Sequence, residues 1–75
     1  MKVNERLVEL RLKNKLKQWQ VANYCHVHRS TYSGYERGKT KIPVDVIISL
    51  SRLYQVSVDY LLGLTNKEST NKKDY

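Results

Sequence analysis

Hydrophobic residues recur along this chain at spacings of three and four, which is the period of an α-helix that buries one face. The pattern predicts five short helices over about residues 4–14, 18–25, 29–36, 44–54 and 57–63, counting the residues that begin and end them. The 75 residues include only three glycines and one proline. We therefore expect an all-α fold with short connections between its helices.

The ends of these helices have recognisable signals. Asn4 and Ser57 can cap the first and fifth helices, Gly38 can end the third in a left-handed conformation, and Pro43 suits the first turn of the fourth. The apolar positions expected to face the core are Val3, Leu7, Leu10, Val21, Ala22, Cys25, Tyr32, Tyr35, Val44, Ile47, Ile48, Leu50, Leu53, Tyr54, Val58, Leu61 and Leu62. The chain is polar after Leu64, so we expect a folded domain over residues 1–63 and a flexible tail over 64–75.

Positive charge is concentrated in one part of the sequence. Between Arg11 and Lys41 there are eight Lys or Arg residues and one acid, Glu36, a local balance of +7 that equals the net charge of the whole chain. The window contains the second and third predicted helices. Such a coincidence of charge and structure indicates a surface that meets a polyanion.

The third predicted helix has an outward face suited to a DNA groove. At about 100° per residue, one arc contains Arg29, Ser30, Ser33, Gly34 and Arg37. Thr31, Tyr32 and Tyr35 fall on the opposite side. The major groove admits one helix, and side chains on a small, polar and basic arc could reach its base edges.

Other function classes find little support in the sequence. A chain of 75 residues has room for one modest core, which argues against an enzyme with a deep pocket and a cofactor domain. The single cysteine and the lack of an export or membrane-spanning run favour a reducing cytoplasm. Cys25, His26 and His28 lie close together but lack the paired spacing of metal ligands, and no third group would orient them as a catalytic pair. We expect neither metal nor cofactor.

Four short motifs occur in order, at Arg6-Leu7 with Leu10-Arg11, at Leu16-x-Gln18-x-x-Val21-Ala22, at Ser30-Thr31-Tyr32-Ser33-x-Tyr35-Glu36-x-Gly38-Lys39, and at Val56-Ser57-Val58-Asp59-Tyr60-Leu61-Leu62-Gly63. Over residues 4–63 the chain thereby resembles the Cro/CI-type (Xre-like) helix-turn-helix repressors of phages and bacteria. The resemblance implies a lambda-repressor-like domain of five helices, with the helix-turn-helix formed by the second and third. It also implies a cytoplasmic, sequence-specific regulator of transcription, a repressor, that binds double-stranded DNA.

The resemblance also implies roles for particular residues. Base-reading positions are His28, Arg29, Ser30, Ser33 and Gly34, and phosphate-contacting positions are Lys17, Gln18, Arg37, Lys39 and Lys41. Arg29 is the sharpest candidate because its guanidinium can contact both O6 and N7 of guanine. A structural ion pair is implied between Arg11 and Glu36. A homodimer on a pseudo-palindromic operator is implied, with contacts by Val58, Leu61, Leu62 and Leu64.

Several positions depart from the family pattern. His26 stands where glycine is usual, at a turn that needs positive φ. Lys17 and His28 stand where Ser, Thr or Asp would cap a helix, so we expect both following helices to be poorly capped. Gly34 replaces a long polar side chain, which either permits close backbone approach or leaves one base unread.

Two alternatives remain open. Trp19 lies away from the apolar face of its helix, and either packs on a neighbouring loop or contacts the DNA backbone or a partner. The chain could also be an antitoxin or adaptor module that binds a regulatory protein partner and has only non-specific affinity for DNA. The six tyrosines could stack on single-stranded bases, but the helical spacing of most of them favours core packing.

Overall fold

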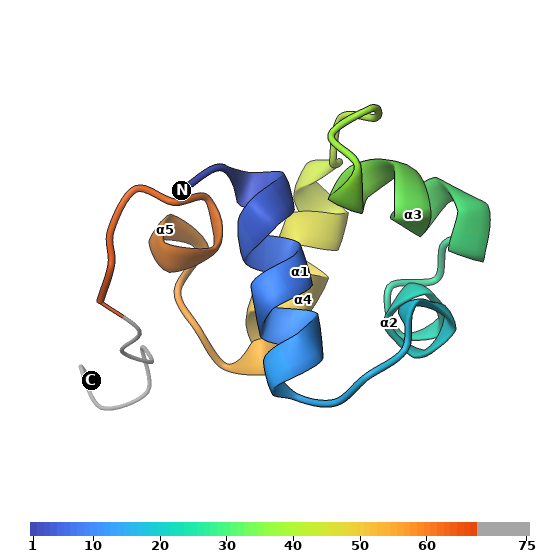
Figure 1. The fold of residues 1–75 in the computed structure, drawn as a ribbon, viewed down its shortest axis with the longest axis horizontal. Helices are drawn as coiled ribbons and strands as arrows, with labels where there is room; N and C mark the ends of the chain where they lie inside the picture. The colour runs from blue at the N-terminus through green and yellow to red at the C-terminus, as the bar shows by residue number, and fades with distance from the viewer. Residues whose placement is uncertain (68–75) are drawn as a thin grey trace.

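The computed structural model describes residues 1–67. As predicted, the fold is all-α, and the helices are α1 (Val3–Lys13), α2 (Gln18–Tyr24), α3 (Arg29–Glu36), α4 (Val44–Tyr54) and α5 (Val58–Leu61). Figure 1 shows α1 through the middle of the molecule with α4 behind it. On one side of α1 lies α5, and on the other lie α2 and α3. The two predicted DNA-binding helices thus form one end of the molecule.

Most helix ends follow the local signals in the sequence. The Ser57 side chain accepts a hydrogen bond from the Tyr60 N–H at 3.0 Å and caps α5. Gly38, after α3, has a φ of 71°, and His26, in the turn after α2, has a φ of 60°. The turn predicted between α2 and α3 therefore forms with histidine at the left-handed position, which histidine tolerates better than most residues.

Two predicted end residues are wrong by one or two positions. Lys2, not Asn4, precedes α1, and its backbone N–H donates to the Glu5 carboxylate at 2.9 Å. Glu5 can satisfy this donor only from the third helical position, so the helix begins before Asn4. Pro43 lies just before α4 in an extended conformation, at φ −62° and ψ 155°, and not in the first helical turn.

The core lies where all five helices meet. Its largest fully buried members are Leu7, Leu10, Val21, Tyr32, Leu50 and Leu61. On α4 the buried residues are Val46, Ile47 and Leu50, whereas Val44 and Ile48 are exposed. The face predicted for α4 was therefore partly wrong. Adjacent β-branched residues satisfy the helical period on two overlapping faces, and packing against the other helices selects one of them.

The segment after α5 leaves the helical body. Leu64 is exposed, and most of the predicted tail over 64–75 lies outside the described residues. Within residues 1–67, no helix is long and apolar enough to cross a membrane.

Candidate nucleic-acid interface

The outward side of α3 begins with a capped first turn. The His28 Nδ1 accepts a hydrogen bond from the Ser30 backbone N–H at 3.2 Å and lies 2.9 Å from the Ser30 hydroxyl. The prediction that α3 is poorly capped was therefore wrong, because an imidazole nitrogen can accept as a hydroxyl or carboxylate oxygen does. This contact holds two predicted base-reading side chains together.

The exposed side of α3 differs from the predicted arc at two positions. Arg29, Ser30 and Arg37 are exposed and Ser33 is half-buried, but Gly34 is buried, and Thr31 is exposed although the wheel placed it inward. Thr40 in the following loop covers Gly34. A Cβ at residue 34 would lie 2.7 Å from the Thr40 hydroxyl oxygen. Gly34 therefore offers no side chain or open backbone to a base.

Thr31 is exposed because α3 meets the core through other residues. Its buried side chains are those of Tyr32, Tyr35 and Glu36, and the rings of the two tyrosines pack edge to face with centroids 6.1 Å apart. Thr31 lies in the first turn, before this buried face is complete. The exposed Thr31 hydroxyl adjoins the predicted base-reading residues Arg29 and Ser30. Its place in the first turn of α3 was the signal that could have identified Thr31 as an exposed residue.

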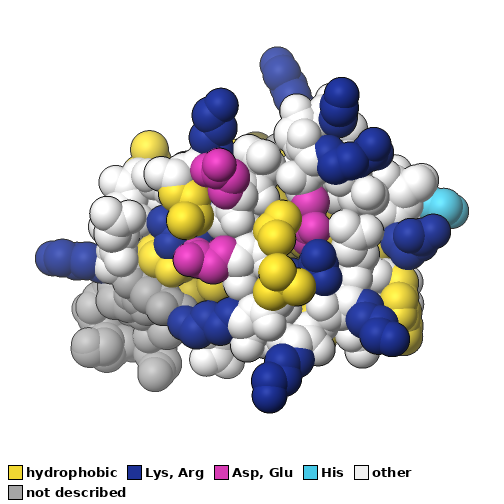
Figure 2. All heavy atoms as spheres, in the orientation of Figure 1, with side chains coloured by type: hydrophobic (Ala, Val, Ile, Leu, Met, Phe, Trp, Pro, Cys, Tyr) yellow, Lys and Arg dark blue, Asp and Glu magenta, His cyan; other side chains and the backbone are white. Residues whose placement is uncertain are grey.

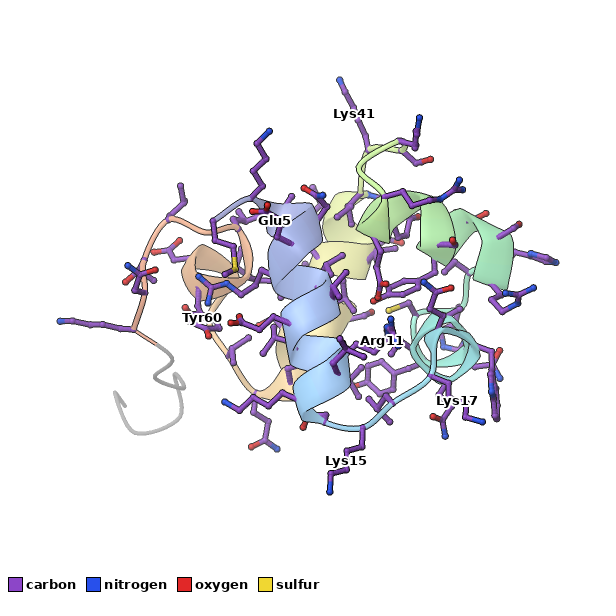
Figure 3. All side chains as sticks on the ribbon, in the orientation of Figure 1. Glu5, Arg11, Lys15, Lys17, Lys41 and Tyr60 are labelled. Carbon is purple, nitrogen blue, oxygen red and sulfur yellow. The ribbon has the colours of Figure 1, made fainter. Side chains whose placement is uncertain are left out.

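Basic side chains surround this helix. Figure 2 shows Lys and Arg side chains along the edge of the molecule formed by α2, α3 and the segment between α3 and α4. Lys17, Arg37, Lys39 and Lys41 are all exposed. In Figure 3, Lys41 points away from the body beyond α3, and Lys17 lies at the beginning of α2. The predicted phosphate-contacting cations therefore occur on both sides of α3.

A buried carboxylate fastens α3 to the rest of the domain. The Glu36 Oε2 accepts from the Arg11 Nε at 2.7 Å and from the Tyr32 hydroxyl at 2.6 Å. Its Oε1 accepts from the Arg11 Nη2 at 3.1 Å and from the Gln18 Nε2 at 3.0 Å. The Glu36 side chain is 5% exposed and that of Arg11 14%. The ion pair implied by the resemblance is present and joins α1 to α3, and the hydrogen bond from Gln18 adds α2.

This environment sets the charge of Glu36. Burial alone would raise the pKa of the carboxyl, but the hydrogen bonds from Arg11, Tyr32 and Gln18 outweigh burial and lower the pKa below its ordinary value of 4.5. Burial and the same carboxylate raise the pKa of Tyr32. Glu36 is therefore ionised and Tyr32 neutral at neutral pH. Their contact is a charge-assisted hydrogen bond inside the protein.

The place of Gln18 could not be read from the sequence. Its side-chain amide donates one hydrogen bond to Glu36, and an amide nitrogen carries two hydrogens. Among residues 1–67, the second N–H donates no further hydrogen bond. The residue joins the internal network and also lies at the beginning of α2, next to the exposed Lys17.

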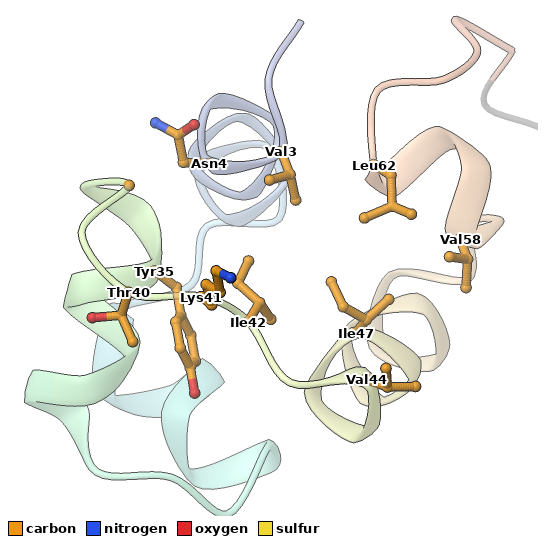
Figure 4. Close-up of a pocket in the computed structure, with 11 residues that line it drawn as sticks. Val3, Asn4, Tyr35, Thr40, Lys41, Ile42, Val44, Ile47, Val58 and Leu62 are labelled. Atoms are coloured by element: carbon orange, nitrogen blue, oxygen red, sulfur yellow. The ribbon is translucent and has the colours of Figure 1, made fainter.

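The predicted dimer residues divide into two groups. Leu61 is 0% exposed and belongs to the core, so its assignment to a dimer contact was wrong. The one-turn helix α5 contacts α1 and α4, and this packing covers Leu61. Val58 is half-buried, whereas Leu62 and Leu64 are exposed, Leu64 by 73%. Val58 and Leu62 also line an apolar groove of about 590 Å³ between α5 and the beginnings of α1 and α4 (Figure 4).

The other candidate side chains are those of the tyrosines, Cys25 and Trp19. Tyr32, Tyr35 and Tyr60 are buried, which confirms the core interpretation of these tyrosines. Burial raises the pKa of the Cys25 thiol to about 11, so this buried cysteine is protonated at neutral pH. Among residues 1–67, no three His, Cys, Asp or Glu side chains are grouped as metal ligands would be. Trp19 is half-exposed on α2.

Comparisons with known proteins agree with this arrangement. Residues 7–61 match the protein family described as helix-turn-helix. The chain is 47% identical over 62 residues to the HTH-type transcriptional regulator YobD of Bacillus subtilis, a match that covers 83% of this chain and 55% of YobD. It is 35% identical over 74 residues to the HTH-type transcriptional regulator ImmR of Bacillus subtilis, covering 99% of this chain and 58% of ImmR.

A solved structure also resembles the fold. The crystal structure of a transcriptional regulator from Listeria innocua aligns with a TM-score of 0.81 at 29% identity. The alignment covers 97% of this chain and 67% of that chain. This chain spans little more than half the length of the two Bacillus relatives that it matches.

Proposed function

Because the chain belongs to the helix-turn-helix family of the Cro/CI type, we propose that it is a sequence-specific repressor whose α3 enters the major groove. Members of this family are DNA-binding regulators of transcription and not enzymes. One observation carries the proposal: the capped first turn of α3 exposes Arg29, Ser30 and Thr31 between basic side chains on both sides. A helix in the major groove reads base edges with residues near its N-terminal end.

Arg29 is the residue that discriminates most strongly among bases in this proposal. It is exposed at the first position of α3, and its planar guanidinium can donate two hydrogen bonds to one guanine. His28, Ser30 and Ser33 each offer at most one hydrogen bond to a base and discriminate less. We assign no base contact to the side of α3 at Gly34.

Lys17, Gln18, Arg37, Lys39 and Lys41 contact phosphates in this proposal. Phosphate contacts supply affinity that depends on salt but carry no sequence information. If about six phosphates are neutralised, the logarithm of the binding constant should fall with the logarithm of salt concentration at a slope of about −5. The network at Glu36 orients the Gln18 side chain. The second amide N–H of Gln18 can then donate to a phosphate oxygen of the DNA.

We further propose that the chain acts as a homodimer on a pseudo-palindromic operator. A single reading helix specifies few base pairs, so discrimination improves when two copies bind half-sites about 34–36 Å apart. The exposed Leu62 and Leu64, with the half-buried Val58, support a contact on the α5 side of the molecule. That side lies opposite α2 and α3 in Figure 1, so a dimer contact there leaves α3 of each copy uncovered.

The decisive experiment selects preferred sites from random duplex DNA and then measures affinities by gel shift. We expect the selected site to bind at least about 10³-fold tighter than random duplex, with a guanine in each half-site. Arg29→Ala should weaken binding by about 5- to 150-fold, the equivalent of about 1–3 kcal/mol, and remove the preference for that guanine. Arg52→Ala, at an exposed arginine of α4, is the matched control and should bind normally.

The same measurements test the alternative of an adaptor with only non-specific DNA affinity. Equal affinity for all duplexes would support the adaptor and contradict the proposal. The sign of regulation is then tested with a reporter gene whose promoter contains the selected site. Repression requires a fall in expression that wild-type protein causes and Arg29→Ala does not, whereas a rise would identify an activator.

A further inference from the structure

We propose that Thr40 is a positioning residue, which packs on Gly34 and holds the loop of Lys39 and Lys41 against α3. Glycine at position 34 thereby determines where these two lysines contact the DNA backbone. The proposal rests on DNA binding by α3. It assigns to Gly34 and Thr40 a joint role in affinity, distinct from the base reading assigned to Arg29.

Direct contacts define this packing. The chain reverses at Gly38, where φ is 71°. The Lys39 backbone N–H donates to the Gly34 carbonyl at 2.9 Å, and the Gly38 N–H donates to the Tyr35 carbonyl at 3.1 Å. These two bonds form a Schellman motif, which folds the segment after α3 back onto the last turn of the helix. The reversal brings Thr40 over Gly34.

Absence of a side chain at residue 34 is what allows Thr40 to come so close. A Cβ there would lie 2.7 Å from the Thr40 hydroxyl oxygen and 3.4 Å from the Thr40 Cβ. The first distance is shorter than non-bonded contacts allow, and the second is a tight contact. Gly34 is not among the glycines with positive φ, which are Gly38 and Gly63 among residues 1–67. The backbone at 34 therefore tolerates alanine, and the need for glycine arises from Thr40 alone.

The packing has consequences for both functions of the surface. Gly34 is four residues after Ser30 and three before Arg37, so a side chain there would share their side of α3. Thr40 fills that place, which confines base reading to the positions of α3 before Gly34. Lys39 and Lys41 adjoin Thr40 in sequence and are exposed. The packing of Thr40 therefore fixes the backbone positions of Lys39 and Lys41 next to α3.

A double-mutant cycle tests the proposal on random duplex DNA with Gly34→Ala, Thr40→Ala and the combined variant. Alanine favours the helix, so Gly34→Ala should melt at or above the wild-type temperature. It should nevertheless displace the loop, weaken binding to random duplex by about 5- to 10-fold, and make the salt slope shallower by about one to two phosphate contacts, each about 0.9. Adding Thr40→Ala removes the clashing hydroxyl and should restore the slope to that of Thr40→Ala alone.

The outcomes separate this proposal from the function on which it rests. Gly34→Ala with wild-type affinity and salt slope would overturn the positioning role, as would a combined variant whose salt slope differs from that of Thr40→Ala alone. Both results leave the site selection and the effect of Arg29→Ala intact. Wild-type protein that binds no duplex DNA would instead refute the proposed function. A loss of stability alone would not change the salt slope of the folded fraction.

Discussion

Replacing Glu36 by alanine should destabilise the domain more than replacing any exposed acid. The substitution removes the acceptor of four hydrogen bonds, two of them from the Arg11 guanidinium. Arg11 would keep one hydrogen bond, from its Nη1 to the Leu16 carbonyl at 3.0 Å. The Tyr32 hydroxyl, in a side chain that is fully buried, would lose its acceptor.

The expected magnitude follows from what remains buried. Removing one partner of a buried ion pair costs about 3–5 kcal/mol, because the other charge stays in the interior without compensation. At about 0.05–0.15 kcal/mol per residue, a domain of this length has a total stability of about 4–11 kcal/mol. The variant would therefore lose a quarter or more of that stability. Since 1 kcal/mol shifts the melting temperature of a small domain by about 4–8 °C, we expect a decrease of at least about 12 °C.

Thermal unfolding followed by circular dichroism measures this decrease, with urea titration as a check on the slope with denaturant. Asp59→Ala is the control, because Asp59 is an exposed acid in the first turn of α5 and should contribute at most about 1 kcal/mol. A melting temperature for Glu36→Ala within about 4 °C of wild type would refute the reasoning. Residual charge on Arg11 would then be solvated well enough to need no partner.

Three other outcomes are expected. Because hydrogen bonds hold the pKa of Glu36 below 4.5, its stabilising contribution is present above that pH and is lost as pH falls further, so acid unfolding followed by circular dichroism should be less steep in Glu36→Gln than in wild type. Leu61→Ala should cost about 2–5 kcal/mol in urea unfolding, whereas Leu64→Ala should cost less than about 0.5 kcal/mol and weaken the dimer in analytical ultracentrifugation; equal stability losses would contradict the division between core and surface. His28→Ala should cost about 1 kcal/mol by removing the cap on Ser30, and an unchanged urea midpoint would show that this hydrogen bond contributes nothing.

Helix positions could be predicted closely because their signals are local. Ser57 and the glycines after α3 and α5 act through the few residues around them, and the apolar period needs one turn of helix to be visible. His26 was identified as the residue with positive φ because it stands where the family pattern has glycine, and its φ is 60°. These features depend on backbone geometry over three to five residues.

The failures at buried and exposed positions concern which neighbour covers a given side chain. A helical wheel separates two sides of a helix, but a loop that folds back can bury the outer side, as Thr40 does at Gly34. A one-turn helix leaves each of its leucines free to face inward or outward, and Leu61 faces the core while Leu62 does not. These outcomes depend on contacts between segments distant in sequence, to which spacing within one helix is blind.

Gln18 shows how such contacts join properties that the sequence keeps apart. The family resemblance implied a phosphate contact for Gln18 and, separately, an ion pair for Glu36, but the two side chains are hydrogen-bonded at 3.0 Å. One amide N–H of Gln18 donates to Glu36, and in the proposed function the other donates to a DNA phosphate. Gln18→Glu would place a second carboxylate against Glu36 and should weaken both properties, because like charges repel strongly where burial limits screening. Residues 11, 18 and 36 therefore form one hydrogen-bonded unit, and in the proposed function this anchor of α3 also orients a contact to the DNA backbone.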